Sequence, residues 1–274
     1  MHSPNATPSA ARRELVVVAT LLVALSLLVA PAEAPIVAAL LPVAVLLAGL
    51  GVLRAAGAVT RPYASLLLPA LLTGGTVASL HLVPPGLWLL VALAAFAVVV
   101  DLVLALEMGI AAQPNAVNEG DQARVLVAAV VTVFIAFTGV AALVPGGMPE
   151  PTASQTAGSS AMTQGWLLVL AAADAVAGLV VGWRISALRF GAPLEIARSA
   201  VTYGLVVAIS AGLIRAIDLP RLVGPAVLTL VFYLWDAQHG SAPARRRERR
   251  FVWEMLLLGG LAIVVMAWNL RVER

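Results

Sequence analysis

Two acidic residues lie inside long apolar stretches of this 274-residue chain, and they are the side chains best placed to do chemistry. Asp174 falls near the middle of one stretch, and Asp101 lies about two helical turns from the end of another. A charge at the centre of a membrane-spanning helix costs about 2.5–3.5 kcal/mol on insertion scales, so such residues face a polar path or another helix. In the functional interpretation, both carboxyl groups are proton or substrate sites along a transport path.

The structural interpretation makes the same acids hydrogen-bond partners between helices, and it is favoured because neither internal repeats nor broken helices accompany them. Each acid shares a helical face with small residues that permit close approach of a second helix. We expect Asp174 to keep a neutral carboxyl bonded to a hydroxyl group, and Asp101 to meet an arginine that snorkels toward the headgroups. The two faces are Ala97, Asp101, Ala105, Gly109 and Asp174, Gly178, Gly182; the candidate hydroxyls are Thr132, Thr138, Thr229 and Ser210; the candidate arginines are Arg54, Arg124 and Arg184.

The elements that must position these acids are membrane-spanning helices. Hydrophobic residues make up 61% of the chain and charged residues 11%, whereas a soluble domain carries about 25% charged residues. We therefore expect an all-α, polytopic integral membrane helical bundle, a single transmembrane domain over residues 1–274 in the cell membrane. At about 20 residues per span, nine spans fit, namely residues 15–30, 35–53, 63–83, 86–107, 123–144, 164–183, 199–217, 219–235 and 251–270.

The arginines give the predicted orientation. With the N-terminus inside, thirteen arginines fall in inner segments and four in outer ones, which is the bias expected of cytoplasmic loops, and the C-terminus is then outside. The net charge of +3 thus reflects topology, and no nucleic-acid partner is expected. The basic inner loop 237–250 should contact anionic lipid headgroups, at about 1 kcal/mol per residue, through Arg245, Arg246, Arg247, Arg249 and Arg250.

Two parts of the predicted topology leave alternatives open. The first span precedes an A-x-A pattern ending at Ala34, so it is either a signal anchor, which Pro35 favours, or a cleaved signal peptide. The seventh and eighth spans form either a tight hairpin or a bent re-entrant pair. The outer loop 145–163 should be mobile, and residues 184–198 should lie along the headgroups as an inner loop.

Function is constrained mainly by the signatures that are missing from the sequence. The chain has no cysteine and no lysine, and it lacks metal-binding and nucleotide-binding motifs, so we expect neither a cofactor nor a metal. Asn118 and Asp121 resemble a helix cap more than a calcium loop, and Glu107 should reach water at a helix end. The leading hypothesis is a non-catalytic scaffold or accessory subunit with membrane lipids and membrane proteins as partners. A small-solute or proton-coupled transporter using Asp101 and Asp174 is the main alternative, and a lipid-modifying enzyme is the third.

Overall fold

The structure is a computed structural model, and it describes residues 8–29, 33–55, 62–111, 118–147, 164–215 and 222–240, with short pieces at 249, 252–253 and 256–260. These residues form helices joined by turns, and no strand occurs among them. The eight helices are α1 (Pro8–Ser26), α2 (Ala34–Ala55), α3 (Pro62–Leu80), α4 (Leu87–Ala111), α5 (Glu119–Leu143), α6 (Gln164–Arg189), α7 (Pro193–Arg215) and α8 (Val223–Gly240).

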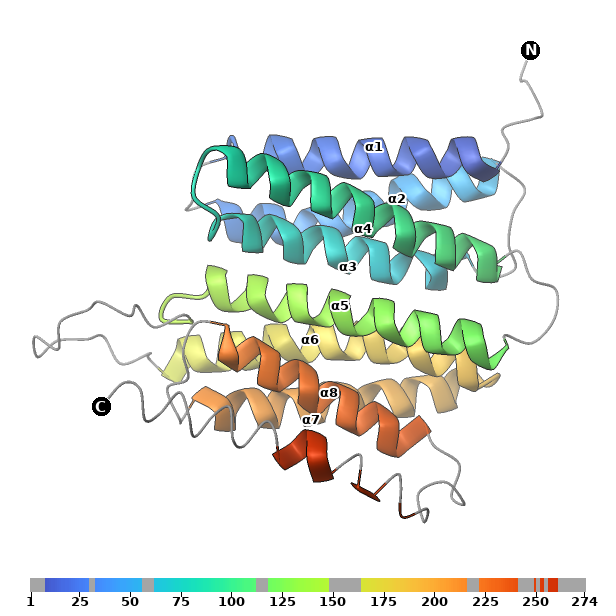
Figure 1. Cartoon of the computed structure of the whole chain (residues 1–274), viewed down its shortest axis with the longest axis vertical. Coiled ribbons are helices and arrows are strands. Elements are labelled where there is room, and N and C mark those ends of the chain that lie inside the picture. The colour runs from blue at the N-terminus through green and yellow to red at the C-terminus, as the bar shows by residue number, and fades with distance from the viewer. Residues whose placement is uncertain are drawn as a thin grey trace, which may run out of the picture.

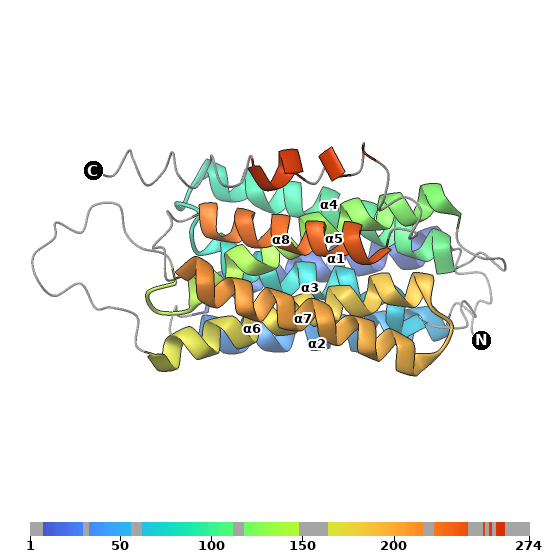
Figure 2. The same ribbon diagram turned by 90° about the horizontal axis from the view of Figure 1, so that it is seen from below.

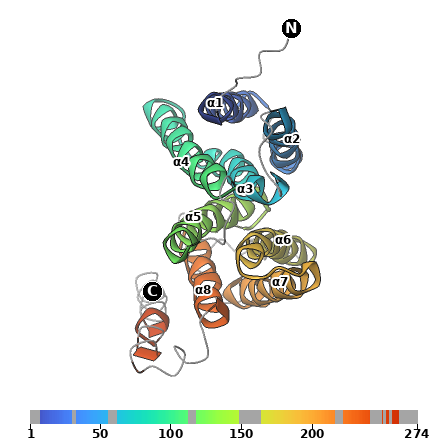
Figure 3. The same cartoon turned by 90° about the vertical axis from the view of Figure 1, so that its right-hand side faces the viewer.

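The all-α membrane bundle predicted from the sequence is confirmed. Five helices, α2 and α4 to α7, are long and apolar enough to cross a membrane, and most of α3 forms a shorter apolar helix. The helices run alongside one another in both side views (Figures 1 and 2). Seen end-on, α1 to α4 form one group and α5 to α8 a second, and the two groups meet where α3 packs against α5 (Figure 3).

Small residues let the two groups meet closely. A Cβ atom added to Gly75 of α3 would lie 2.8 Å from the Cα atom of Ala136, and one added to Gly139 of α5 would lie 2.6 Å from the Gly75 carbonyl oxygen. The Ser79 hydroxyl donates to the Gly75 carbonyl of its own helix and lies 3.2 Å from the Ile135 carbonyl of α5. Such backbone approach holds helices together in lipid, where burial of apolar surface between helices gives little driving force.

The first eight predicted spans correspond to α1 to α8, but four boundaries were wrong because charged residues continue the helices. Helix α1 begins at Pro8, α6 continues to Arg189, α7 begins at Pro193 and α8 continues to Gly240. Residues 184–189 and 193–198 are therefore helical, so the predicted inner loop 184–198 is shorter than expected. Most of the ninth predicted span, 251–270, lies outside the described residues, as do most of the outer loop 145–163 and most of the inner loop 237–250.

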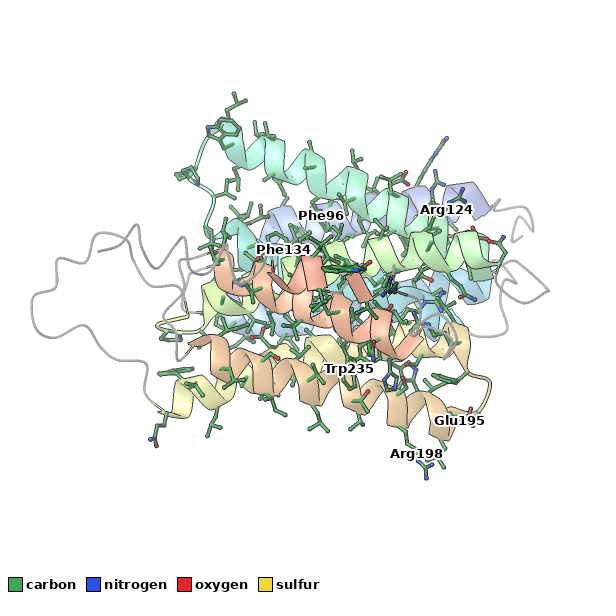
Figure 4. The ribbon with its side chains drawn as sticks, turned by 60° about the horizontal axis from the view of Figure 1, so that its bottom comes forward. Phe96, Arg124, Phe134, Glu195, Arg198 and Trp235 are labelled. Carbon is green, nitrogen blue, oxygen red and sulfur yellow. The ribbon has the colours of Figure 1, made fainter. Side chains whose placement is uncertain are left out.

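The two ends of the bundle differ in charge. At one end α1, α3, α5 and α7 begin and α2, α4, α6 and α8 end, and we call it the basic end because Arg12, Arg124, Arg184, Arg189 and Arg198 lie there. Figure 4 shows Arg124, Glu195 and Arg198 at this end of the bundle. The other end, where α6 begins, is called the opposite end. That the basic end faces the cytoplasm stays a prediction from the arginine bias.

Candidate functional site

Asp174 lies in the interior of the bundle, as its place in an apolar span predicts. Its exposed fraction is 3%, and it lines a cavity of about 10 Å³ between α5, α6, α7 and α8. A space of this size holds about one water molecule. The other lining residues are Phe137, Ala141, Leu170, Ala211, Ile214, Gly224, Pro225 and Leu228.

The small residues that share a face with Asp174 pack against α7, in agreement with the sequence pattern. A Cβ atom on Gly178 would lie 2.8 Å from Cγ2 of Val207, and one on Gly182 would lie 2.7 Å from Cβ of Tyr203. Any larger side chain at either glycine would push the helices apart. The fit of α6 to α7 therefore fixes the rotation of α6, and with it the direction of the Asp174 side chain.

Glu107 and Arg184 form a buried ion pair between α4 and α6. The Arg184 Nε atom donates to both carboxylate oxygens of Glu107 at 2.9 and 3.0 Å, and Nη2 donates to Oε2. Glu107 has no exposed surface and Arg184 is 4% exposed. The predictions that Glu107 reaches water and that Arg184 belongs to a headgroup loop were wrong. Because Glu107 neutralises the charge of Arg184, the arginine side chain can stay buried between the helices and α6 continues past it.

Asp101 meets an arginine, as predicted, but not one of the three that the sequence suggested. Arg12 Nε of α1 lies 2.9 Å from the Asp101 carboxylate, and both side chains are about one-third exposed, at 34% and 37%. Arg184 is bonded to Glu107 instead, and Arg124 pairs with Asp121 at 3.3 Å. The third candidate, Arg54, has its side chain outside the described residues.

A third charged cluster, which sequence reasoning missed, joins α6, α7 and α8. Arg189 donates from Nη1 and Nη2 to the two carboxylate oxygens of Asp236 at 2.8 and 2.9 Å. The Tyr203 hydroxyl donates to Asp236 at 2.7 Å and accepts from Arg189 at 3.2 Å. Asp236 was missed because the eighth span was ended at Trp235, although no helix-breaking residue follows before Gly240.

The end of α8 is shaped to receive Arg189. A Cβ atom on Gly240 would lie 2.4 Å from the guanidinium carbon of Arg189, so a larger residue there would require the Arg189 side chain to shift. A cation at a helix C-terminus is also favoured by the helix dipole. Nearby, the Trp235 ring stacks on His239 at a centroid distance of 5.1 Å.

The remaining predicted sites are partly covered by the structure. Asn118 caps α5 by accepting the Asp121 backbone amide at 2.8 Å, which confirms the capping prediction. In the part of the chain that the structure describes, no three histidine or acidic side chains gather as a metal site would require. Arg249 is exposed, whereas Arg245, Arg246, Arg247 and Arg250 lie outside the described residues.

The chemistry of these groups is therefore unevenly distributed. Three ion pairs at or near the basic end each tie two helices together, while Asp174 lies beside a space for one water in the other half of the bundle. The chain matches no protein-family model, and comparisons with curated proteins and with solved structures show no significant similarity.

Proposed function

We propose that this membrane protein is a non-catalytic scaffold or accessory subunit of a membrane complex. The observation that carries the proposal is the use of its intramembrane charges: each of the pairs Arg12–Asp101, Arg184–Glu107 and Arg189–Asp236 joins one helix of the bundle to another. Charges engaged in this way stabilise a particular helix arrangement and are not free to bind a solute.

The sizes of the hollows support the same proposal. The two cavities that border charged residues, at Asp174 and at Arg189, each measure about 10 Å³, far below the several hundred Å³ of small-molecule sites. A larger hollow of about 470 Å³ lies beside the α3–α4 turn and the start of α4, lined only by apolar residues including Trp88 and Val91. An apolar groove on the outside of a membrane bundle suits lipid chains and neighbouring helices.

A native-mass experiment tests the subunit proposal. Extraction of the full chain from its own membrane in a mild detergent, followed by mass measurement of the intact particle, should give a complex with a partner at fixed stoichiometry. The Glu107→Gln variant should lose that complex in proportion to its loss of folded protein, whereas an exposed control, Gln238→Glu, should keep it. A solitary monomer with the mass of one chain would contradict the proposal.

A second candidate function is proton-coupled transport through Asp174, and the cavity beside that carboxyl is the observation that favours it. Asp101 suits this role less, because its carboxylate is paired with Arg12. Reconstituted vesicles distinguish the two functions. A transporter should give a proton flux that Asp174→Asn abolishes and that Asp101→Asn leaves measurable. A subunit should give no flux, whether unsubstituted or in either variant.

The protein is also expected to bind the headgroups of anionic lipids at the membrane surface. The basic inner segment that includes Arg245, Arg246, Arg247, Arg249 and Arg250 should hold this region against anionic lipids of the cell membrane, with each arginine adding about 1 kcal/mol. Replacing all five by glutamine should weaken the co-purification of anionic lipid, as measured by lipid mass spectrometry. Unchanged lipid content would show that the arginines act only as a topology signal.

A further inference from the structure

The seam between α6 and α7 is closed on the basic side of Asp174. One helical turn from Asp174 toward the basic end, Gly178 packs so closely on Val207 that no side-chain atom would fit between them. One turn farther in the same direction, Gly182 packs equally closely on Tyr203. The next turn is joined by a 2.8 Å hydrogen bond from the Ser186 hydroxyl to the Ser199 hydroxyl. Since even a methyl group would not fit at the two glycines, no file of water can follow this seam from the basic end to the carboxyl.

On the other side of Asp174 there is a cavity that the carboxyl itself borders, whereas the cavity of similar volume toward the basic end, beside Arg189, does not include Asp174. The cavity of about 10 Å³ lies toward the opposite end of the bundle, under residues in the last turn of α7 and the first turn of α8, including Ile214, Gly224 and Pro225. Asp174 is ten residues from the start of α6, about 15 Å along the helix. The cavity has room for about one water and lies between the Asp174 carboxyl and the opposite end of the bundle, so it spans part of that distance.

No other ionisable side chain lines this cavity, among the four helices whose described residues enclose it. Helix α3, which also packs against α6, has no ionisable residue over Ala64–Leu80. On α6 itself, Arg184 is ten residues away and bonded to Glu107. The other ionisable residues of the enclosing helices whose side chains the structure describes lie farther toward the basic end: Asp121 and Arg124 on α5, Arg189 on α6, Glu195, Arg198 and Tyr203 on α7, and Tyr233, Asp236 and His239 on α8. The side chain of Glu119, the first residue of α5, lies outside the described residues. Arg215, Asp218 and Arg221, at and beyond the end of α7, have side chains outside the described residues.

We propose that Asp174 and the adjoining cavity form a one-sided proton-binding site, which exchanges its proton with water at the opposite end of the bundle and not at the basic end. The ligand is a proton carried by a single water molecule. A metal cation needs several oxygen ligands around it, and a space for one water among apolar side chains does not supply them. The site rests on the cavity and on the closed seam, so it does not depend on whether the chain is a subunit.

Carbodiimide labelling tests the site in the full-length protein held in lipid nanodiscs. Dicyclohexylcarbodiimide is an apolar reagent that modifies protonated carboxyl groups in apolar surroundings, and peptide mass spectrometry locates the product. Asp174 should be modified, the modification should fall as the pH is raised in a single-proton step, and Asp174→Asn should remove it. Glu107 and Asp236, whose carboxylates are bonded to arginines, should remain unmodified.

Three controls make a negative result informative. The same protein unfolded in detergent should be modified at Asp174, which shows that the peptide is detectable. Asp174→Glu should restore a modifiable carboxyl, and Asp218→Asn should leave the pH dependence unchanged. The proposal would be overturned if Asp174 were modified in the unfolded protein but not in the folded one. It would also be overturned if modification of the folded protein did not depend on pH.

The direction of proton exchange is tested by filling the cavity. Gly224→Leu places a side chain in the volume that the water needs and should lower the rate of modification by about tenfold. Gly212→Leu is the matched control, because a Cβ atom at Gly212 meets no neighbour within 4 Å, and its rate should equal that of the parent. Ala211→Leu fills the same cavity from α7 and replaces the first variant if that one does not fold. An unchanged rate in the folded filled variant would show that protons reach Asp174 by another route.

Discussion

The basic end and the opposite end of this bundle are held together by different forces. At and near the basic end, ion pairs link α1 to α4, α4 to α6, and α6 to α8, and the Tyr203 hydroxyl brings α7 into the last of these. Toward the opposite end, the contacts that hold α3 to α5 are close approaches of glycine and alanine, such as Gly75 to Gly139. The basic end adds charged, directional bonds to close glycine packing between α6 and α7, while the contact of α3 with α5 toward the opposite end depends mainly on shape.

This difference follows from where a charge can be tolerated in a membrane. Arginine side chains near a span end reach toward water or toward an acid, so a pair there forms at a moderate free-energy cost. Deeper in the bilayer the cost of an unpaired charge grows, and packing of small residues replaces charge as the source of specificity. Asp174 is a carboxyl at such a depth, and it lies beside a cavity with room for about one water.

The largest expected effect comes from breaking the fully buried pair. Glu107→Gln leaves Arg184 charged, buried and without its carboxylate, which should lower the free energy of unfolding by about 3–5 kcal/mol. Equilibrium unfolding in mixed micelles of increasing SDS content measures this loss. In the double variant Glu107→Leu with Arg184→Met, no buried charge remains, so most of the stability should return. A single variant within about 1 kcal/mol of the parent would show that the pair is not buried as described.

The next effect should come from the uncharged seam near the opposite end. Gly139→Leu would force a side chain against the Gly75 carbonyl oxygen and should separate α3 from α5, at a cost of about 1–3 kcal/mol. Gly109→Leu is a matched control because a Cβ atom at Gly109 meets no neighbour within 4 Å. Unfolding curves for the two variants should therefore differ, and coincident curves would refute the close α3–α5 packing.

A smaller loss is expected from the cluster that joins α6, α7 and α8. Tyr203→Phe removes a hydroxyl that donates to Asp236 and accepts from Arg189, while the Arg189–Asp236 pair itself remains. The loss of these two hydrogen bonds should cost about 1 kcal/mol, because Asp236 and Arg189 stay bonded to each other. The same unfolding measurement, together with Asp236→Asn as the more severe variant, ranks the two. If Tyr203→Phe were the worse of the pair, the ring packing and not the hydroxyl would be the important contact.

Much of the fold could be predicted from the sequence, because apolar runs of span length have few alternatives. The positions of α2, α4 and α5 follow from the length of those runs, and the Asn118 cap follows from its place before one of them. The ends of α6 and α8 could not be predicted, because a stretch of apolar residues ends at the first arginine or aspartate. Whether the helix ends there too depends on a partner from another helix, which a single sequence does not identify.

The candidate site was predictable only in part for the same reason. The depth of Asp174 and its small-residue face can be read from spacing along one helix, and both are found in the structure. The cavity beside it is enclosed by residues of four helices, so no local pattern encodes it. Asp101 shows the intermediate case, in which an arginine partner was expected but Arg12, 89 positions earlier in the sequence, supplies the charge.

Breaking the Arg12–Asp101 pair should have the smallest effect on the free energy of unfolding. It compares an exposed ion pair with a buried one at the same end of the bundle. Both side chains are about one-third exposed, so water and salt screen their attraction, and Asp101→Asn should cost less than about 1 kcal/mol of unfolding free energy. Raising the ionic strength should reduce even this difference, because salt screens exposed charges. Glu107→Gln should show no such dependence on salt, since its arginine is buried. A loss at Asp101 as large as that at Glu107 would mean that α1 is clamped to α4 by a buried charge, and that the basic end is held at three equally strong points and not mainly at one.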